Sequence, residues 1–305
     1  MANTFTPMKP LELKSILVAT DLTESADKAL EHGIAIARHY RATLYVVYVV
    51  SSLAFTLVGP EAVEAAAEAS ERDINGLVHR LADSGRLNGL DVRPVVLKGN
   101  VEEELESFAR AHRVDLIVVS THGRCGMAKL LFGSVAQMIS KRCCCPVLTV
   151  GPNSQGPWHQ NPADSGKPLL FATAFNKACA RAVPYAISLA GDFERQLFVL
   201  HVIPPNRTHL LKKDNMTHGD QEAPALAHLN ALIRSNANLK CTATPLVESC
   251  EPAEGILRAA KRIDAVTIIM GVDRDLNSDL TTRLPGSITD QVHRDAMCPV
   301  LTVGR

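Results

Sequence analysis

The chain has 305 residues, about twice the length of a typical domain, so two domains are the first expectation. It has 46% hydrophobic and 21% charged residues, with 32 Lys plus Arg against 32 Asp plus Glu, which predicts a globular protein and gives no electrostatic reason to expect nucleic acid or a membrane as a partner. The first residues, MANTFTPMKP, lack the apolar core of a secretory signal, and no apolar run approaches the ~20 residues of a membrane span, so we expect a soluble cytoplasmic protein.

Strand-like and helix-like patterns alternate through the first half. Residues 14–20 (KSILVAT) predict a buried strand, and a helix with Thr23 as the expected N-cap follows. Strands that alternate with helices predict a parallel, doubly wound sheet. Further strands are expected over residues 43–50, 91–98, 115–120 and 146–150, and further helices over residues 60–81, 101–112 and 134–142.

The most informative stretch of this half is VSTHGRCGMAKLLFGSV, residues 119–135. A buried strand leads into a loop with glycines, and Gly133 and Ser134 stand where a new helix begins. Glycine lets the backbone approach a ligand closely, and the unpaired amides of a helix start attract anions. The pattern predicts an anion site, with a tight connection that holds no ligand as the alternative. Gly133 is also expected to need a backbone angle that branched residues resist.

The cysteines are expected to be structural. Eight are present, and Cys143, Cys144 and Cys145 are consecutive. Adjacent cysteines do not readily bridge each other, and no C-x-x-C pair accompanies them, so we expect buried thiols in a reducing compartment. Cys125, inside the glycine loop, is the thiol expected to be open to modification.

Residues 151–168 (GPNSQGPWHQNPADSGKP) have no periodicity and predict a linker. Beyond the linker the first half returns: KSILVATDLT at Lys14 is echoed by KPLLFATAFN at Lys167, and CPVLTVG at Cys145 reappears at Cys298. The offset is constant, since 174 minus 21 and 299 minus 146 both give 153. The sequence therefore predicts the duplication of a whole domain.

The expected domains are residues 1–150 and 169–305. Two similar halves favour a pseudo-two-fold arrangement, like that of a symmetric dimer. We expect the last strands, 146–150 and 299–303, to pack together, because each would otherwise be an exposed apolar edge.

ILVATDLT, VVYVV, DLIVVSTHGR with KLLFGSV, and CPVLTV together resemble the universal stress protein family. The resemblance covers residues 14–150 and, more weakly, residues 167–303, so the chain is similar to the tandem-domain members. It implies, in each half, a five-stranded parallel sheet with helices on both faces. It also implies that the fifth strands of the two halves meet, as they do in family dimers.

The resemblance implies a nucleotide site in the first half. ATP-binding members carry G-x2-G-x9-G-[ST], and the first position of that motif is Ser120 here instead of Gly, which puts the affinity in doubt without removing the site. Asp21 takes the place of the acidic residue that contacts the adenosine part, and Val49 that of the hydrophobic adenine contact. The implied nucleotide-binding residues are Ala19, Thr20, Asp21, Val49, Val119, Ser120, Gly123, Arg124, Gly133, Ser134 and Val135.

Two of these roles have structural alternatives. Asp21 could instead serve as an acidic residue that favours the start of the first helix. Arg124 and the nearby Lys129 could meet phosphates or face solvent.

The second half departs from the motif. Ala174 replaces Asp21, and if Gly271 takes the place of Ser120, the middle glycine position falls on Arg274. The neighbouring Asp273 and Asp275 would repel a polyphosphate, so this site is expected to be degenerate.

These features predict a stress-response regulatory protein that holds ATP or ADP, with or without Mg²⁺, in its first domain. The second domain would be structural or partner-binding. No Walker lysine or catalytic constellation supports an enzyme, although slow ATP hydrolysis is left open. The alternative is an interaction module that binds no nucleotide. The sequence indicates no particular protein partner and leaves self-association beyond the pseudo-dimer open.

Overall fold

The computed structural model describes residues 11–51, 60–121, 133–143, 145–154, 166–205, 218–236, 241–273 and 287–304. Strands and helices alternate through both halves, as expected. The first half contains β1 (Ser15–Ala19), α1 (Glu24–Tyr40), β2 (Thr43–Ser51), α2 (Pro60–Asp83), β3 (Val92–Gly99), α3 (Val101–Ala111), β4 (Leu116–Ser120), α4 (Ser134–Arg142) and β5 (Val147–Val150). The second half contains β6 (Leu169–Ala172), α5 (Lys177–Asp192), β7 (Leu197–Ile203), α6 (His218–Ser235), β8 (Ala243–Ser249), α7 (Pro252–Arg262), β9 (Thr267–Gly271), α8 (Ile288–Asp295) and β10 (Val300–Val303).

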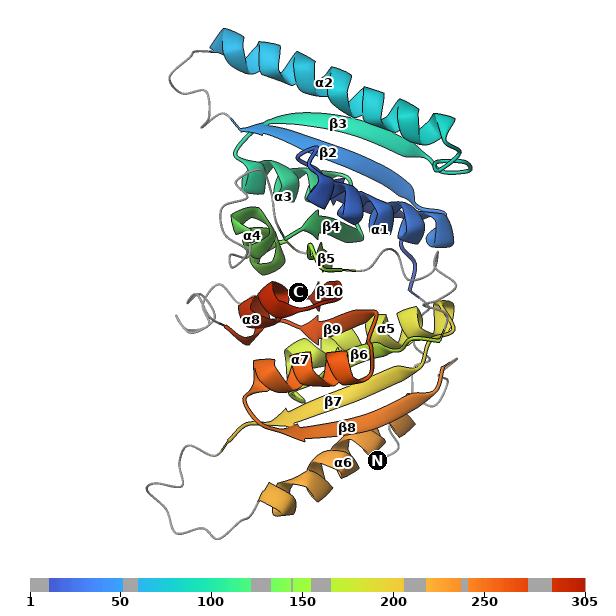
Figure 1. Cartoon of the computed structure of the whole chain (residues 1–305), viewed down its shortest axis with the longest axis vertical. Helices are drawn as coiled ribbons and strands as arrows, with labels where there is room; N and C mark the ends of the chain where they lie inside the picture. The colour runs from blue at the N-terminus through green and yellow to red at the C-terminus, as the bar shows by residue number, and fades with distance from the viewer. Residues whose placement is uncertain are drawn as a thin grey trace.

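The strands form one ten-stranded sheet in the order β3-β2-β1-β4-β5-β10-β9-β6-β7-β8. Neighbouring strands within each half are parallel, whereas β5 and β10 pair antiparallel, with Leu148 opposite Leu301. The two halves therefore meet at the middle of the molecule, with α2 and α6 at its far ends (Figure 1). The predicted doubly wound domains and their joining through the last strands are both confirmed.

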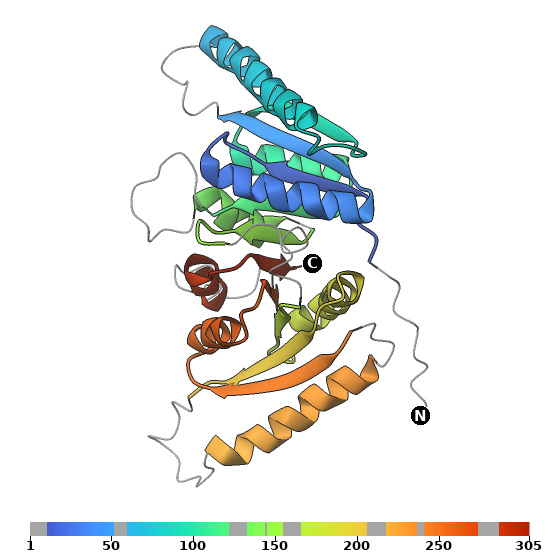
Figure 2. The same cartoon turned by 45° about the vertical axis from the view of Figure 1, so that its right-hand side comes forward.

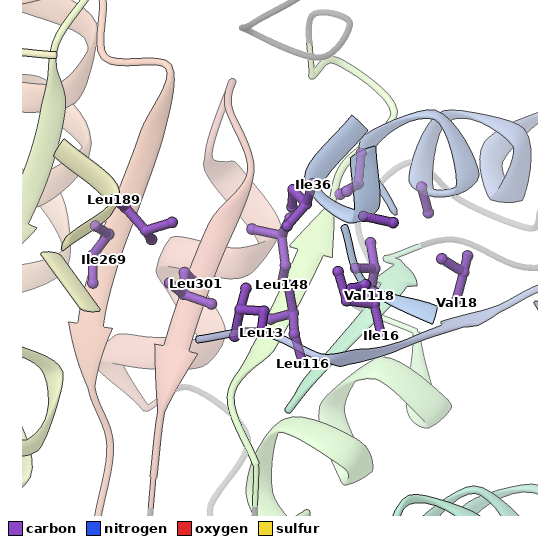
Figure 3. Close-up of a cluster of buried hydrophobic side chains, with 14 of the residues drawn as sticks. Leu13, Ile16, Val18, Ile36, Leu116, Val118, Leu148, Leu189, Ile269 and Leu301 are labelled. Carbon is purple, nitrogen blue, oxygen red and sulfur yellow. The ribbon is translucent and has the colours of Figure 1, made fainter. Parts of the chain in front are cut away.

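The helices cover both faces of the sheet, and the two faces are built differently (Figures 1 and 2). On the face covered by α1, α2, α5 and α6, a single cluster of buried side chains runs through both halves, including Leu148 and Leu301 at the junction (Figure 3). On the face covered by α3, α4, α7 and α8, each half has its own cluster. One core is thus continuous across the boundary between the halves.

Polar and aromatic contacts add to this junction. The Tyr40 hydroxyl, at the end of α1, donates to the Asp192 carboxylate at the end of α5, with 2.8 Å between the oxygens. The ring of Phe193 lies 4.0 Å from that of His39. The Thr149 hydroxyl, in β5, lies 2.6 Å from Nδ1 of the buried His293, in α8 of the other half.

The expectation of buried thiols is confirmed for Cys143 and Cys145. Burial raises the pKa of the Cys298 thiol, which precedes β10, to about 12, so this cysteine stays protonated. Cys144 and Cys125 lie outside the described residues. No helix in the described part of the chain is long and apolar enough to cross a membrane.

Candidate functional site

The predicted site lies where the strand order of the first half reverses. β1 has β2 on one side and β4 on the other, and the last residue of β1, Ala19, is paired with Val119 of β4. In doubly wound sheets, ligands bind beyond the carboxyl ends of the strands at this switch point. The topology therefore brings the segment that follows Ala19 and the segment that follows Val119 to one edge of the sheet.

The segment after β1 forms a tight turn. The backbone amide of Thr20 donates to the Val47 carbonyl at 2.9 Å, and Leu22 has a left-handed φ of 62°. Asp21 accepts hydrogen bonds through Oδ1 from the amide and hydroxyl of Thr23, at 3.1 and 2.5 Å. Thr23 in turn caps α1 by accepting from the Ala26 amide, as predicted. The Asp21 carboxylate thus holds the turn in shape at the mouth of the predicted site.

An apolar floor lies beside this turn. Val119 is 2% exposed, and the partly buried Ala19, Val49 and Val135 pack against the same core cluster, formed with α3 and α4. These residues come from three strands and a helix, and the structure brings them to one side of the sheet. Such a surface suits the flat, apolar face of an aromatic ring.

The start of α4 forms the other side of the site. Gly133 is its N-cap and has no side-chain capping bond. The Gly133 amide donates to the Thr121 carbonyl at 2.8 Å, whereas the amides of residues 134–136 have no acceptor within the helix. Three backbone donors and the positive end of the helix dipole are therefore directed toward this edge of the sheet.

One expectation for Gly133 is wrong. Its backbone angles, φ −57° and ψ 136°, are open to any L residue, so no special conformation requires glycine there. What glycine provides at this N-cap is the absence of a side chain beside the open amides.

The remaining predicted residues are placed as follows. Ser120, half-buried, ends β4 and is paired with Val150, and Ser134 is the first residue of α4. Gly123 and Arg124 lie outside the described residues, as does Lys129. Thr121, a 2% exposed residue whose carbonyl accepts from the Gly133 amide, was not among the predicted site residues, because a backbone hydrogen bond between the two ends of a loop does not depend on residue type.

The second half repeats the turn without its acid. Thr173, Ala174, Phe175 and Asn176 take the places of Thr20 to Thr23, and Phe175 has a left-handed φ of 56°. Asn176 caps α5 by accepting from the Cys179 amide at 2.9 Å. Ala174 offers no side-chain acceptor, so the turn shape is kept while the carboxylate is lost.

The end of β9 is crowded. Gly271 is paired with Val303 as Ser120 is with Val150, so Gly271 does take the place of Ser120. A Cβ on Gly271 would lie 2.2 Å from the backbone oxygen of Ala178, in the first turn of α5. The carboxylate of Asp273, two residues after Gly271, lies 3.6 Å from the Arg181 guanidinium of α5. Helix α5 therefore sits directly against this strand end. Arg274 and Asp275 lie outside the described residues.

Helix α8 also begins differently from α4. Its N-cap is Ser287, whose hydroxyl accepts from the Asp290 amide at 3.1 Å. The Asp290 carboxyl group is itself buried in the first turn, at 5% exposure. A side-chain cap and an acidic group thus occupy the start of α8, whereas the N-cap of α4 is a glycine that has no side chain.

Comparisons with known proteins agree with this duplication. The model of the Universal stress protein family matches the chain twice, over residues 12–151 and 166–304. Universal stress protein MJ0531 of Methanocaldococcus jannaschii is 30% identical over 138 residues, which cover 45% of this chain and 81% of that protein.

Solved structures cover the whole tandem. The crystal structure of a universal stress protein from Archaeoglobus fulgidus has a TM-score of 0.72 at 19% identity, with 96% of this chain and 97% of that chain covered. A structure of a putative universal stress protein from Pseudomonas aeruginosa has a TM-score of 0.63 at 16% identity, covering 96% and 93%. At these identities the likeness concerns the fold.

Proposed function

This chain belongs to the universal stress protein family, and we propose that it is a regulatory protein that binds one adenine nucleotide, ATP or ADP, in its first domain. The second domain then serves as a structural or partner-binding half.

The observation that carries the proposal is the glycine N-cap of α4. Gly133 brings no side chain to cap the amides of residues 134–136, which stand at the edge of the sheet where doubly wound proteins bind ligands. Phosphate oxygens are the acceptors that such a helix start favours. The capped and acidic start of α8 supports a single phosphate-binding position, in the first half.

The neighbouring residues suit the rest of a nucleotide. The partly buried Ala19, Val49 and Val135, which pack against the same cluster as the buried Val119, offer an apolar surface for an adenine ring. Asp21, at the mouth of the site, is an acceptor of the kind that a ribose hydroxyl needs. Mg²⁺, where present, would enter with the phosphates of the ligand. Within the described residues, no group of three or more His, Cys, Asp or Glu side chains is placed to hold a metal.

The proposal of a regulatory role rests on the catalytic residues that the sequence provides. The sequence has no Walker lysine after the glycines, and we propose that binding, with at most slow hydrolysis, is the activity of the site. The competing function is an interaction module that binds no nucleotide, which Ser120 in place of the first glycine favours.

Mass spectrometry of small molecules released by denaturing the purified protein would test the proposal. We expect an adenine nucleotide to be released. If none is released, and none binds when ATP or ADP is added back, the protein is an interaction module and the proposed function is wrong.

A further inference from the structure

A cavity of about 380 Å³ lies in the first half, between α1 and the turn that joins α2 to β3. Helix α1 lines it with Glu31, Ile34 and Arg38, and the turn lines it with residues that include Gly85, Arg86 and Asn88. Helix α1 begins beside the proposed nucleotide site, at the carboxyl end of β1, and runs back along the sheet. Since Arg38 is in its last turn, the cavity lies at the opposite edge of the sheet from that site.

The backbone of the turn is fixed by the end of α2. Gly85 has a left-handed φ of 74°, a conformation that glycine adopts without strain. The Gly85 amide donates to the Ala82 carbonyl at 2.9 Å, and the next amide, that of Arg86, donates to the Leu81 carbonyl at 3.0 Å. These two bonds form a Schellman motif, which ends the helix and holds Arg86 at the wall of the cavity.

Two guanidinium groups are held in place at this wall. The Arg38 guanidinium donates through Nη2 to the backbone carbonyl of Arg86. The Arg86 guanidinium in turn lies 2.8 Å from the Glu31 carboxylate, and its side chain is 45% exposed. Among the described residues each guanidinium bonds to one partner, so most of its five N–H donors are open to a ligand. A ligand would therefore meet donors that are already positioned, which lowers the entropy cost of binding.

The lining indicates the class of ligand. Its charged side chains are two arginines and one glutamate, and 2 minus 1 leaves one positive charge. A carboxylate matches the planar fork of a guanidinium. The volume exceeds what one carboxylate needs, the 2% exposed Ile34 adds an apolar part to the wall, and Asn88 adds an amide. These features suit the body of an organic molecule better than an inorganic ion.

The second half lacks the charged residues of the cavity. Pro184 stands where Glu31 stands in the first half, since 184 minus 31 is 153. By the same offset, Gly191 replaces Arg38 and Leu239 replaces the second arginine. The second half nevertheless forms the same strands and helices in the same order. The fold therefore does not require these three charges, and they distinguish the first half.

We propose that this cavity binds a small organic molecule with one carboxylate group. The guanidinium groups of Arg38 and Arg86 hold the carboxylate, and the body of the molecule lies against Ile34. The site belongs to the first half alone and does not depend on the nucleotide proposed for the other edge of the sheet.

Titration of the full chain with benzoate, followed by the backbone amide NMR signals of Gly85 and Asn88, tests the proposal. Both signals should shift and reach saturation, whereas benzamide, which has the same ring and no charge, should leave them unchanged. Arg38→Gln and Arg86→Gln should each raise the dissociation constant of benzoate at least fivefold, and circular dichroism checks that both variants are folded. The matched control is Arg72→Gln, at an exposed position of α2 that does not line the cavity, which should bind benzoate as the parent does.

Four results would overturn the proposal. The first is that neither signal shifts at any benzoate concentration. The second is that benzamide shifts both signals as strongly as benzoate does, because the charge is then not recognised. The third is an unchanged affinity for benzoate in both glutamine variants. The fourth is that inorganic phosphate shifts the two signals and benzoate does not, because the arginines then hold an inorganic anion.

Discussion

The Asp21 carboxylate has a structural task in addition to its proposed contact with the nucleotide. It accepts two hydrogen bonds from Thr23, the residue that caps α1. The alternative role at a helix start, which the sequence left open, is therefore present in the structure. The two roles are separable, because asparagine keeps an oxygen for Thr23 and loses the charge.

Replacement of Asp21 should separate ligand binding from folding. Asp21→Ala should weaken nucleotide binding by roughly ten- to a hundred-fold, since one charged hydrogen bond is worth ~1.5–3 kcal/mol. It should lower the free energy of unfolding by about 1 kcal/mol, through loss of the turn contacts. Calorimetric titration and denaturant unfolding measure the two effects.

The control is Asp21→Asn, which should keep parental stability and bind with intermediate affinity, because a neutral acceptor is weaker than a charged one. If Asp21→Ala binds ATP as tightly as the parent, the residue acts only in the turn.

The two halves differ in how the helix before their last strand begins, α4 in the first half and α8 in the second. Both helices begin at a Gly-Ser pair, but the glycine is the N-cap of α4 (Gly133), whereas the serine is the N-cap of α8 (Ser287). The sequence predicted the bounds of most elements of the first half to within one or two residues, because the strands are continuous apolar runs and α1 has a strong capping residue. It did not predict this difference, which depends on how each helix packs.

The close packing of α5 against the end of β9 could not be predicted from the sequence either. Gly271 is the glycine that the family motif has at this position, where the first half has Ser120, yet it is needed for close contact with the backbone of Ala178. Residue types alone do not distinguish a glycine that makes room for a ligand from one that makes room for a helix. The roles of Gly123 and Arg124 stay predictions, because both lie outside the described residues.

Gly271→Ala should destabilise the second domain by about 1–3 kcal/mol, because its Cβ would meet backbone atoms that cannot rotate away. Ser120, at the matching position of the first domain, already carries a Cβ. Ser120→Ala should therefore lower the free energy of unfolding by less than about 1 kcal/mol. Denaturant unfolding of both variants checks this, and equal losses would show that α5 can move away from β9.

At the scale of the whole molecule, the duplication could be predicted from the sequence because long matching segments share one offset in residue number. The meeting of β5 and β10 was predicted from the need to cover two apolar edges, and the structure shows that the two strands pair antiparallel. The continuous core on one face, and the contact between the ends of α1 and α5, did not follow, because they depend on the angle between the halves.

The bond between Tyr40 and Asp192 should stabilise the junction. Burial and the Asp192 carboxylate both raise the pKa of Tyr40, so the phenol stays protonated and can donate at any ordinary pH. A double-mutant cycle of Tyr40→Phe and Asp192→Ala should give a coupling free energy of about 1–2 kcal/mol in denaturant unfolding. A coupling near zero would mean that the hydrogen bond contributes nothing to holding the halves together.

The central claim is that one half of a duplicated chain keeps a nucleotide site and the other has closed it. Titration calorimetry of ATP into nucleotide-free protein tests this claim most directly, because it counts sites. The glycine N-cap of α4 and the side-chain cap of α8 predict one site per chain. Two equivalent sites, or no binding at all, would contradict the account.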